Sequence, residues 1–260
     1  MKTVYKVADD RFSVETYVTG SGEPLLFLHG AGGLIGFEPF LDLLGERYTV
    51  YAPHLPGYGE STGGEFIEDV FDAALFYHQL MDELGIPSAH IVGHSMGAML
   101  AAETAALDTR RARKLVLASA AGFWLDRHPI ADLFATPFNE LAALIFHDPK
   151  SALAQALTAV PDDQGAMLAL YLERMKRLGM ASRFLWPIPE RGLGKRAYRI
   201  AAPTLLIWGE SDRLIPPAYA EEFLSRIRNC RLEIIREAGH MVMYERPQAF
   251  VKAVCDFLAA

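Results

Sequence analysis

Short apolar runs alternate with longer segments of helical periodicity along most of the chain. Near-continuous apolar runs are typical of strands that are covered on both faces. They occur at 25–28, 49–52, 90–93, 114–118, 204–208 and 232–235. Two leading segments, 4–7 and 12–18, instead alternate polar and apolar residues and predict an antiparallel hairpin.

Helices are expected between these strands, at 37–45, 67–84, 96–107, 217–227 and 247–258. Strands that alternate with helical segments are typical of an α/β fold. The pattern therefore predicts a mostly parallel sheet of about eight strands with helices on both faces.

The strand rhythm stops between Gly122 and Arg199. Short helices separated by prolines are expected there instead, at 130–134, 138–146, 151–160 and 165–178. We therefore expect an α/β core made of 1–121 and 199–260, with a helical insertion, or cap, at 122–198.

The insertion is rich in aromatic residues and methionine. Most of these side chains are expected to pack helices together, whereas some would line a water-excluding substrate pocket. Phe138, Met167 and Trp186 are our candidates for the pocket. The arginines of the insertion are expected to be mainly solvated, although one that turned inward could grip a carboxylate: Arg174, Arg177, Arg183 and Arg191.

The most informative motif is Gly93-His94-Ser95-Met96-Gly97, between an expected strand and an expected helix. A G-x-S-x-G in that context indicates a nucleophile elbow, in which a sharp turn exposes the serine hydroxyl at the end of a sheet. The glycines allow the helix and the strand to approach closely. Ser95 is therefore the candidate nucleophile.

Three other segments follow expected strands and fit the same chemistry. Asp212 comes after 204–208, His240 comes after 232–235, and a glycine-rich loop, 29–33, comes after 25–28. Open parallel sheets place their active sites beyond the carboxyl ends of strands. A histidine can accept the serine proton, a carboxylate can orient the histidine, and the loop can aim backbone N–H groups at an oxyanion.

Together these motifs resemble the α/β-hydrolase fold superfamily over nearly the whole chain, and in particular serine hydrolases with a helical cap. The resemblance includes the 29–33 loop, the segment 55–61, the elbow, the Asp212 turn and Ala238-Gly239-His240. It implies Ser95 as nucleophile, His240 as base and Asp212 as orienting acid. It also implies the backbone N–H groups of Ala31 and Met96 as the oxyanion hole, and no cofactor or metal.

Composition narrows the possible partners. The 260 residues carry a net charge of -7 and are 51% hydrophobic, which favours a large core and offers no basic patch for nucleic acid or an anionic membrane. Cys230 and Cys255 are expected to be ordinary buried or half-buried thiols. No apolar run reaches membrane-spanning length, and the N-terminus lacks a signal core, so a cytoplasmic location is expected. The oligomeric state stays open.

The substrate class is less constrained. A serine at position 95 argues against relatives that carry an aspartate nucleophile. Hydrolases that cleave carbon–carbon bonds of ring-fission keto-dienoates share the triad order, but they often carry asparagine where this chain has His94 and an aromatic residue where it has Met241. These departures from the carbon–carbon hydrolases favour an esterase that acts on small to medium apolar carboxylic esters. Carbon–carbon hydrolysis and a ligand receptor with little turnover are the alternatives.

Overall fold

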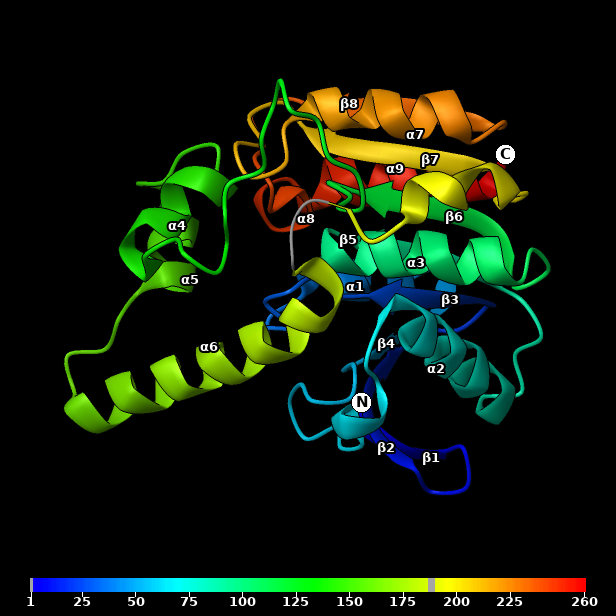
Figure 1. The fold of residues 1–260 in the computed structure, drawn as a ribbon, viewed down its shortest axis with the longest axis horizontal. Helices are drawn as coiled ribbons and strands as arrows, with labels where there is room; N and C mark the ends of the chain where they lie inside the picture. The colour runs from blue at the N-terminus through cyan, green and yellow to red at the C-terminus, as the bar shows by residue number, and fades with distance from the viewer. Residues whose placement is uncertain (1, 187–189) are drawn as a thin grey trace.

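The computed structural model of the protein describes residues 2–186 and 190–260, which are built around one central sheet (Figure 1). Its strands are β1 (Lys2–Val7), β2 (Phe12–Thr19), β3 (Glu23–Leu28), β4 (Tyr48–Pro53), β5 (Ala89–His94), β6 (Ala112–Ala118), β7 (Thr204–Gly209) and β8 (Cys230–Ile235). The strand order is β1-β2-β4-β3-β5-β6-β7-β8. β2 runs antiparallel to both β1 and β4, and all other neighbours are parallel. The predicted leading hairpin and mostly parallel eight-stranded sheet are confirmed.

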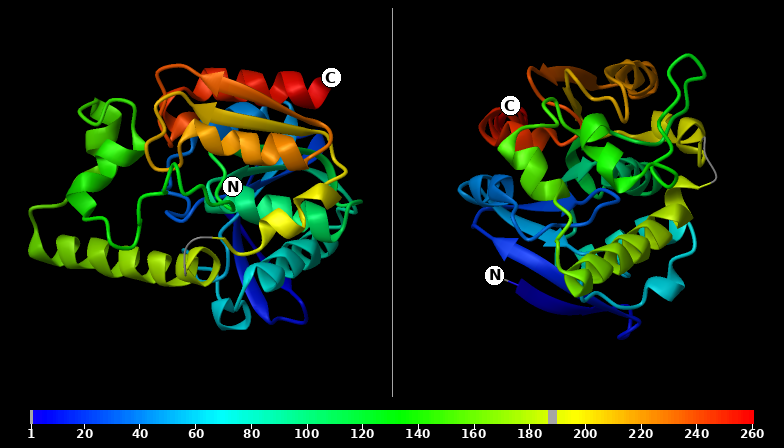
Figure 2. Two further views of the ribbon diagram at one scale, coloured as in Figure 1. Left: turned by 45° about the horizontal axis from the view of Figure 1, so that its top comes forward. Right: turned by 90° about the vertical axis from the view of Figure 1, so that its left-hand side faces the viewer.

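Helices cover both faces of this sheet (Figure 2). One face carries α2 (Val70–Glu83), α3 (Met96–Leu107) and α7 (Ala220–Arg226), and the other carries α1 (Pro39–Gly45), α8 (Val242–Glu245) and α9 (Pro247–Ala259). Short 3-10 turns, η1 (Gly64–Phe66) and η4 (Pro217–Tyr219), lie in the connections. Each face of the sheet packs against its helices in a separate hydrophobic core, and successive side chains of β3 enter the two cores in turn. Leu26 and Leu28 lie in the core with α2, α3 and α7, whereas Leu25 and Phe27 lie in the core with α1, α8 and α9. Burial of each such side chain contributes about 1.5–3 kcal/mol.

Between β6 and β7 the chain leaves the sheet and forms the β6–β7 insertion, residues 119–203. It contains α4 (Phe138–Ile145), α5 (Ala152–Thr158) and α6 (Gln164–Leu185), followed by the 3-10 turns η2 (Leu193–Lys195) and η3 (Ala197–Arg199). The helices α4, α5 and α6 lie together on one side of the sheet in Figures 1 and 2.

Two details of the insertion differ from the sequence prediction. The helix expected at 130–134 is absent, because the Asp132 carboxylate accepts the backbone N–H groups of Phe134 and Ala135 and forms a turn instead. Helix α6 continues past the expected end at residue 178, because Gly179 is tolerated inside it. No helix in the described parts of the chain has the length and apolar character needed to span a membrane.

Candidate active site

Ser95 occupies a sharp turn between β5 and α3. Its backbone has φ 55° and ψ −118°, in a region that costs a non-glycine residue on the order of 1–3 kcal/mol. The turn is fixed by the Ser95 N–H, which donates to the Ala118 carbonyl at 2.9 Å. A side chain at Gly93 would lie 2.5 Å from the Gly97 carbonyl oxygen, and one at Gly97 would lie 2.2 Å from that of Leu28. Both glycines of the motif are therefore required by close backbone approach.

His240 and Asp212 lie beyond the ends of β8 and β7 and are hydrogen-bonded to each other. His240 Nδ1 lies 2.9 Å from Asp212 Oδ2, and both residues are buried. The other carboxylate oxygen of Asp212 accepts the backbone N–H groups of Leu214 at 3.0 Å and Ile215 at 2.9 Å. An ionised carboxylate can only accept, so Nδ1 carries the proton and Nε2 keeps a lone pair. The arrangement leaves His240 able to accept a proton at Nε2.

Ser95 and His240 both line one cavity of about 260 Å³. Among the residues that the structure describes, no hydrogen bond joins the Ser95 hydroxyl to the His240 ring. Such contacts are often long without substrate and tighten in the reacting complex. Ser95 and His240 thus meet on this cavity, and Asp212 lies behind it, joined to His240 by the hydrogen bond.

The two expected oxyanion donors also lie at this point. Met96 is the first residue of α3, where a backbone N–H has no acceptor within the helix. Ala31 lines the cavity from the loop after β3, which curls back through a hydrogen bond from the Gly33 N–H to the Gly30 carbonyl at 3.0 Å. Both positions are compatible with donation to a developing oxyanion.

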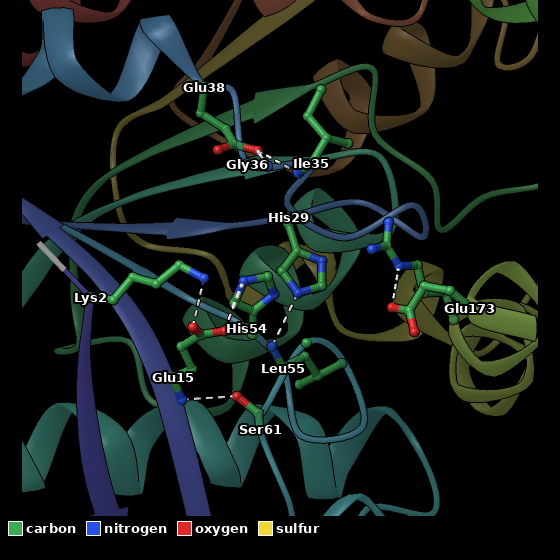
Figure 3. Close-up of polar contacts among 12 residues, drawn as sticks. Lys2, Glu15, His29, Ile35, Gly36, Glu38, His54, Leu55, Ser61 and Glu173 are labelled. Carbon is green, nitrogen blue, oxygen red and sulfur yellow. Dashed lines mark hydrogen bonds and ion pairs between the residues drawn. The ribbon is translucent and has the colours of Figure 1, made fainter. Parts of the chain in front are cut away.

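His29 holds this loop in place, as Figure 3 shows. Its Nε2 accepts the Leu55 backbone N–H at 3.1 Å, so Nδ1 carries the proton and donates to the Gly30 carbonyl at 2.8 Å. Burial lowers the pKa of His29 to about 3, so the ring is neutral at physiological pH. The structural role expected for His29 agrees with these contacts.

The peptide backbone around His240 is fixed by two side chains that sequence reasoning missed. His94 Nε2 donates to the His240 carbonyl at 2.9 Å, and the two rings lie 4.9 Å apart. Glu245 accepts the backbone N–H of Gly239 at 2.6 Å and that of His147, from the insertion, at 2.7 Å. No sequence signal indicates these pairings, because His94 and His240 are 146 residues apart.

Buried neutral histidines predict a loss of stability in acid. Burial lowers the pKa of His94, like that of His29, to about 3 in the folded state, against about 6.5 in the unfolded chain. As the pH falls through 6.5 the unfolded state binds protons that the folded state cannot, so stability is complete above that value and decreases toward pH 3. Each histidine should contribute a slope of about 1.4 kcal/mol per pH unit.

Urea unfolding at a series of pH values between about 7.5 and 4.5 would measure this slope. A His94→Asn variant should show a shallower slope than the parent, since one of the histidines whose pKa is lowered by burial is removed. His54, His78 and His90 contribute in the same direction, because burial lowers their pKa values too. An unfolding free energy that stays constant down to about pH 4.5 would contradict the expectation.

Only one of the three candidate pocket residues lines the cavity. Phe138 lines it, together with apolar side chains such as Leu141, Leu170 and Leu214. Met167 and Trp186 do not line it, which differs from our expectation. Met167 lies one turn before Leu170 on α6, at the end of the helix that extends beyond the cavity, and Trp186 follows the end of α6 and is 49% exposed.

The insertion arginines also differ from expectation. Arg174 and Arg177 line this cavity, Arg191 lines a smaller one, and Arg183 donates to the Gly64 and Ile67 carbonyls. Arg177 Nε donates to Glu173 at 2.8 Å, and its Nη1 donates to the Gly32 carbonyl at 2.7 Å. Figure 3 shows Glu173 on α6 beside the 29–33 loop. The Tyr58 hydroxyl lies 3.2 Å from the Ala31 carbonyl oxygen and 3.1 Å from that of Arg177. Helix α6 is therefore tied to the loop that carries Ala31.

A second cavity, of about 60 Å³, also reaches Ser95. Ser95, Leu133 and Leu214 border both cavities, and Arg191 lies on the wall of the smaller one. Ser95 therefore lies between a large and a small cavity.

Possible metal ligands and the two cysteines are the remaining groups with reactive potential. Within the described residues, no group of three or more His, Cys, Asp or Glu side chains is arranged to hold a metal ion. Cys230 and Cys255 are free thiols, and burial raises the pKa of Cys230 to about 12, which disfavours the reactive thiolate.

Comparison with known proteins agrees with the fold. The model of the alpha/beta hydrolase family matches residues 25–253, so the chain belongs to that family. It is 30% identical over 245 residues to the dihydrolipoyllysine-residue acetyltransferase component of the acetoin cleaving system of Cupriavidus necator, covering 89% of this chain and 62% of that protein. The chain thus spans less than two thirds of that relative's length.

Two further similar proteins are covered over more of their own length. The 2-hydroxy-6-oxononadienedioate/2-hydroxy-6-oxononatrienedioate hydrolase of Cupriavidus pinatubonensis is 28% identical over 277 residues, covering 97% of this chain and 93% of that protein. The solved structure of a membrane phospholipase A, described as a bacterial virulence factor, matches with a TM-score of 0.78 at 25% identity. That match covers 100% of this chain and 86% of the other. The protein is therefore a hydrolase-family member whose relatives differ in substrate.

Proposed function

We propose that the protein is a serine hydrolase that cleaves small to medium, mostly apolar carboxylic esters through an acyl-enzyme. The observation that carries the proposal is the buried hydrogen bond from Asp212 to His240, a residue that lines the same cavity as Ser95. A serine hydroxyl is a weak nucleophile at neutral pH and needs such an oriented base.

The reaction would proceed in two halves. Ser95 Oγ attacks the ester carbonyl while its proton passes to His240 Nε2, and Asp212 stabilises the resulting imidazolium. The Ala31 and Met96 N–H groups stabilise the oxyanion, and loss of one such donor typically raises the barrier by about 2.7–4 kcal/mol. The carbon–oxygen bond then breaks and the alcohol leaves with the proton from His240. Water attacks the acyl-enzyme by the reverse proton path and releases the acid.

We propose that residues 122–198 act as a cap on a core formed by 1–121 and 199–260. The insertion supplies Phe138 to the cavity, and it is joined to the core by the bond from the Arg177 guanidinium to the Gly32 carbonyl. A wall of this kind excludes water from the acyl-enzyme and selects substrates by shape.

Carbon–carbon hydrolysis of ring-fission keto-dienoates is the second candidate, and the similarity to the Cupriavidus pinatubonensis hydrolase supports it. The same serine, histidine and aspartate could serve that reaction. His94 and Met241, where those hydrolases often carry other residues, favour the ester reaction.

A comparison of two substrates separates these functions. We expect a higher kcat/KM for p-nitrophenyl butyrate than for a ring-fission keto-dienoate in the same buffer. A dienoate advantage of about tenfold or more, or ~1.4 kcal/mol of transition-state binding, would move the protein to the carbon–carbon hydrolases. Turnover of neither compound, together with saturable binding of one of them, would favour a ligand receptor.

A further inference from the structure

Arg174 lies on the wall of the catalytic cavity, on the same face of α6 as Leu170 and Leu178. Its Nη2 donates to the Thr136 carbonyl at 3.2 Å, and its guanidinium carbon lies 4.9 Å from the centre of the Phe138 ring. The side chain is partly buried. A cation is therefore held beside apolar surface, facing the space that a substrate would fill.

No carboxylate forms an ion pair with Arg174 among the residues that the structure describes. Its neighbour Arg177 differs, because Glu173 neutralises that guanidinium at 2.8 Å. The buried His94 ring facing the cavity is neutral, since burial lowers its pKa to about 3. Arg174 is thus left as the uncompensated charge on this wall, and burial lowers its pKa from the ordinary value.

We infer that Arg174 is a specificity-determining residue that binds a carboxylate at the far end of the substrate's acyl chain. The inference rests on the proposed ester hydrolysis at Ser95 and changes the preferred substrate from an uncharged ester to a half-ester of a dicarboxylic acid, whose apolar chain ends in a carboxylate. Within the described residues only one of the five N–H groups of Arg174 donates to the protein, so a forked pair of donors is free for a carboxylate. A carboxylate ligand would also compensate the charge that the fold leaves partly buried.

A purely structural role is the competing explanation, because the bond to Thr136 also ties α6 to the segment before α4. A structural role would affect all esters alike. A recognition role would change the ratio of kcat/KM for a carboxylate-ended ester to that for a neutral ester of similar length.

The test therefore measures this ratio, with mono-p-nitrophenyl adipate against p-nitrophenyl hexanoate and mono-p-nitrophenyl suberate against p-nitrophenyl octanoate. The variants are Arg174→Gln, which removes the charge, and Arg174→Lys, which keeps the charge but loses the fork. Arg183→Gln is the matched control. Arg183 lies on the same helix, donates to the Gly64 and Ile67 carbonyls and lines neither cavity.

We expect the parent to prefer one of the carboxylate-ended esters, and Arg174→Gln to lower that ratio about tenfold or more. Arg174→Lys should give an intermediate ratio, and Arg183→Gln should keep the parent's ratio. The inference is overturned if the parent shows no such preference at either length, or if Arg174→Gln changes the ratio no more than Arg183→Gln does. If Arg174→Gln does not fold, the Arg174→Lys ratio decides the question in the same way.

The two proposals fail differently. Absence of Ser95-dependent hydrolysis of every ester would contradict the proposed function. Ser95-dependent hydrolysis without a carboxylate preference would contradict only the role of Arg174.

Discussion

Replacement of Ser95 by alanine is expected to lower ester turnover by about 10⁴-fold or more while leaving the fold intact. The hydroxyl lies at the elbow and faces the cavity, and the backbone bond that fixes the turn, from the Ser95 N–H to the Ala118 carbonyl, is kept in the variant. Steady-state release of p-nitrophenol from the butyrate ester and thermal unfolding would measure the two effects. A fluorophosphonate should label the parent but not the variant.

Ser119 offers a matched control for this experiment. It follows β6, the strand next to β5, and it is buried with a positive φ of 45° like that of Ser95. Its hydroxyl oxygen is buried without a hydrogen-bond partner among the described residues. Ser119→Ala should therefore retain turnover and labelling. Labelling of any residue other than Ser95, or full activity in Ser95→Ala, would contradict the nucleophile assignment.

The positions of the catalytic candidates could be predicted because they depend on local sequence and on one topological rule. Ser95, Asp212 and His240 each follow a strand that the apolar pattern identifies. Parallel strands end at the same edge of a sheet, so residues far apart in sequence were expected to meet there. The hydrogen bond between His240 and Asp212 agrees with that expectation.

The contacts that support the catalytic candidates could not be predicted in the same way. The bond from His94 joins a side chain to the backbone of a loop 146 residues away, at the His240 carbonyl. The bond from the Gly239 N–H to Glu245 is local, and it too joins a side chain to the backbone. Backbone acceptors and donors are present at every residue, so no sequence pattern marks which one a side chain will reach.

The sequence also could not predict which face of an insertion helix lines the cavity. The arrangement of apolar residues predicts that 165–178 is helical, but both faces of α6 carry large apolar side chains. Leu168, Leu172 and Met175 are exposed, whereas Leu170 lines the cavity. Periodicity alone therefore could not separate Met167 from Leu170, or place Arg174 on the wall.

Replacement of Asp212 by asparagine is expected to lower kcat/KM for the ester by about 10⁴-fold, and the surroundings of the carboxylate explain why. One oxygen of Asp212 accepts the Leu214 and Ile215 N–H groups, so the amide oxygen of an asparagine would take that place. The amide NH₂ would then face His240 Nδ1, which must become an acceptor. The ring proton would move to Nε2, and His240 could no longer accept the proton of Ser95.

Asp69→Asn is the matched control, because Asp69 accepts the Phe71 and Asp72 N–H groups at the start of α2 without contacting a histidine. Steady-state kinetics should show a large loss for Asp212→Asn and little change for Asp69→Asn. Full activity in Asp212→Asn would mean that another acid orients His240.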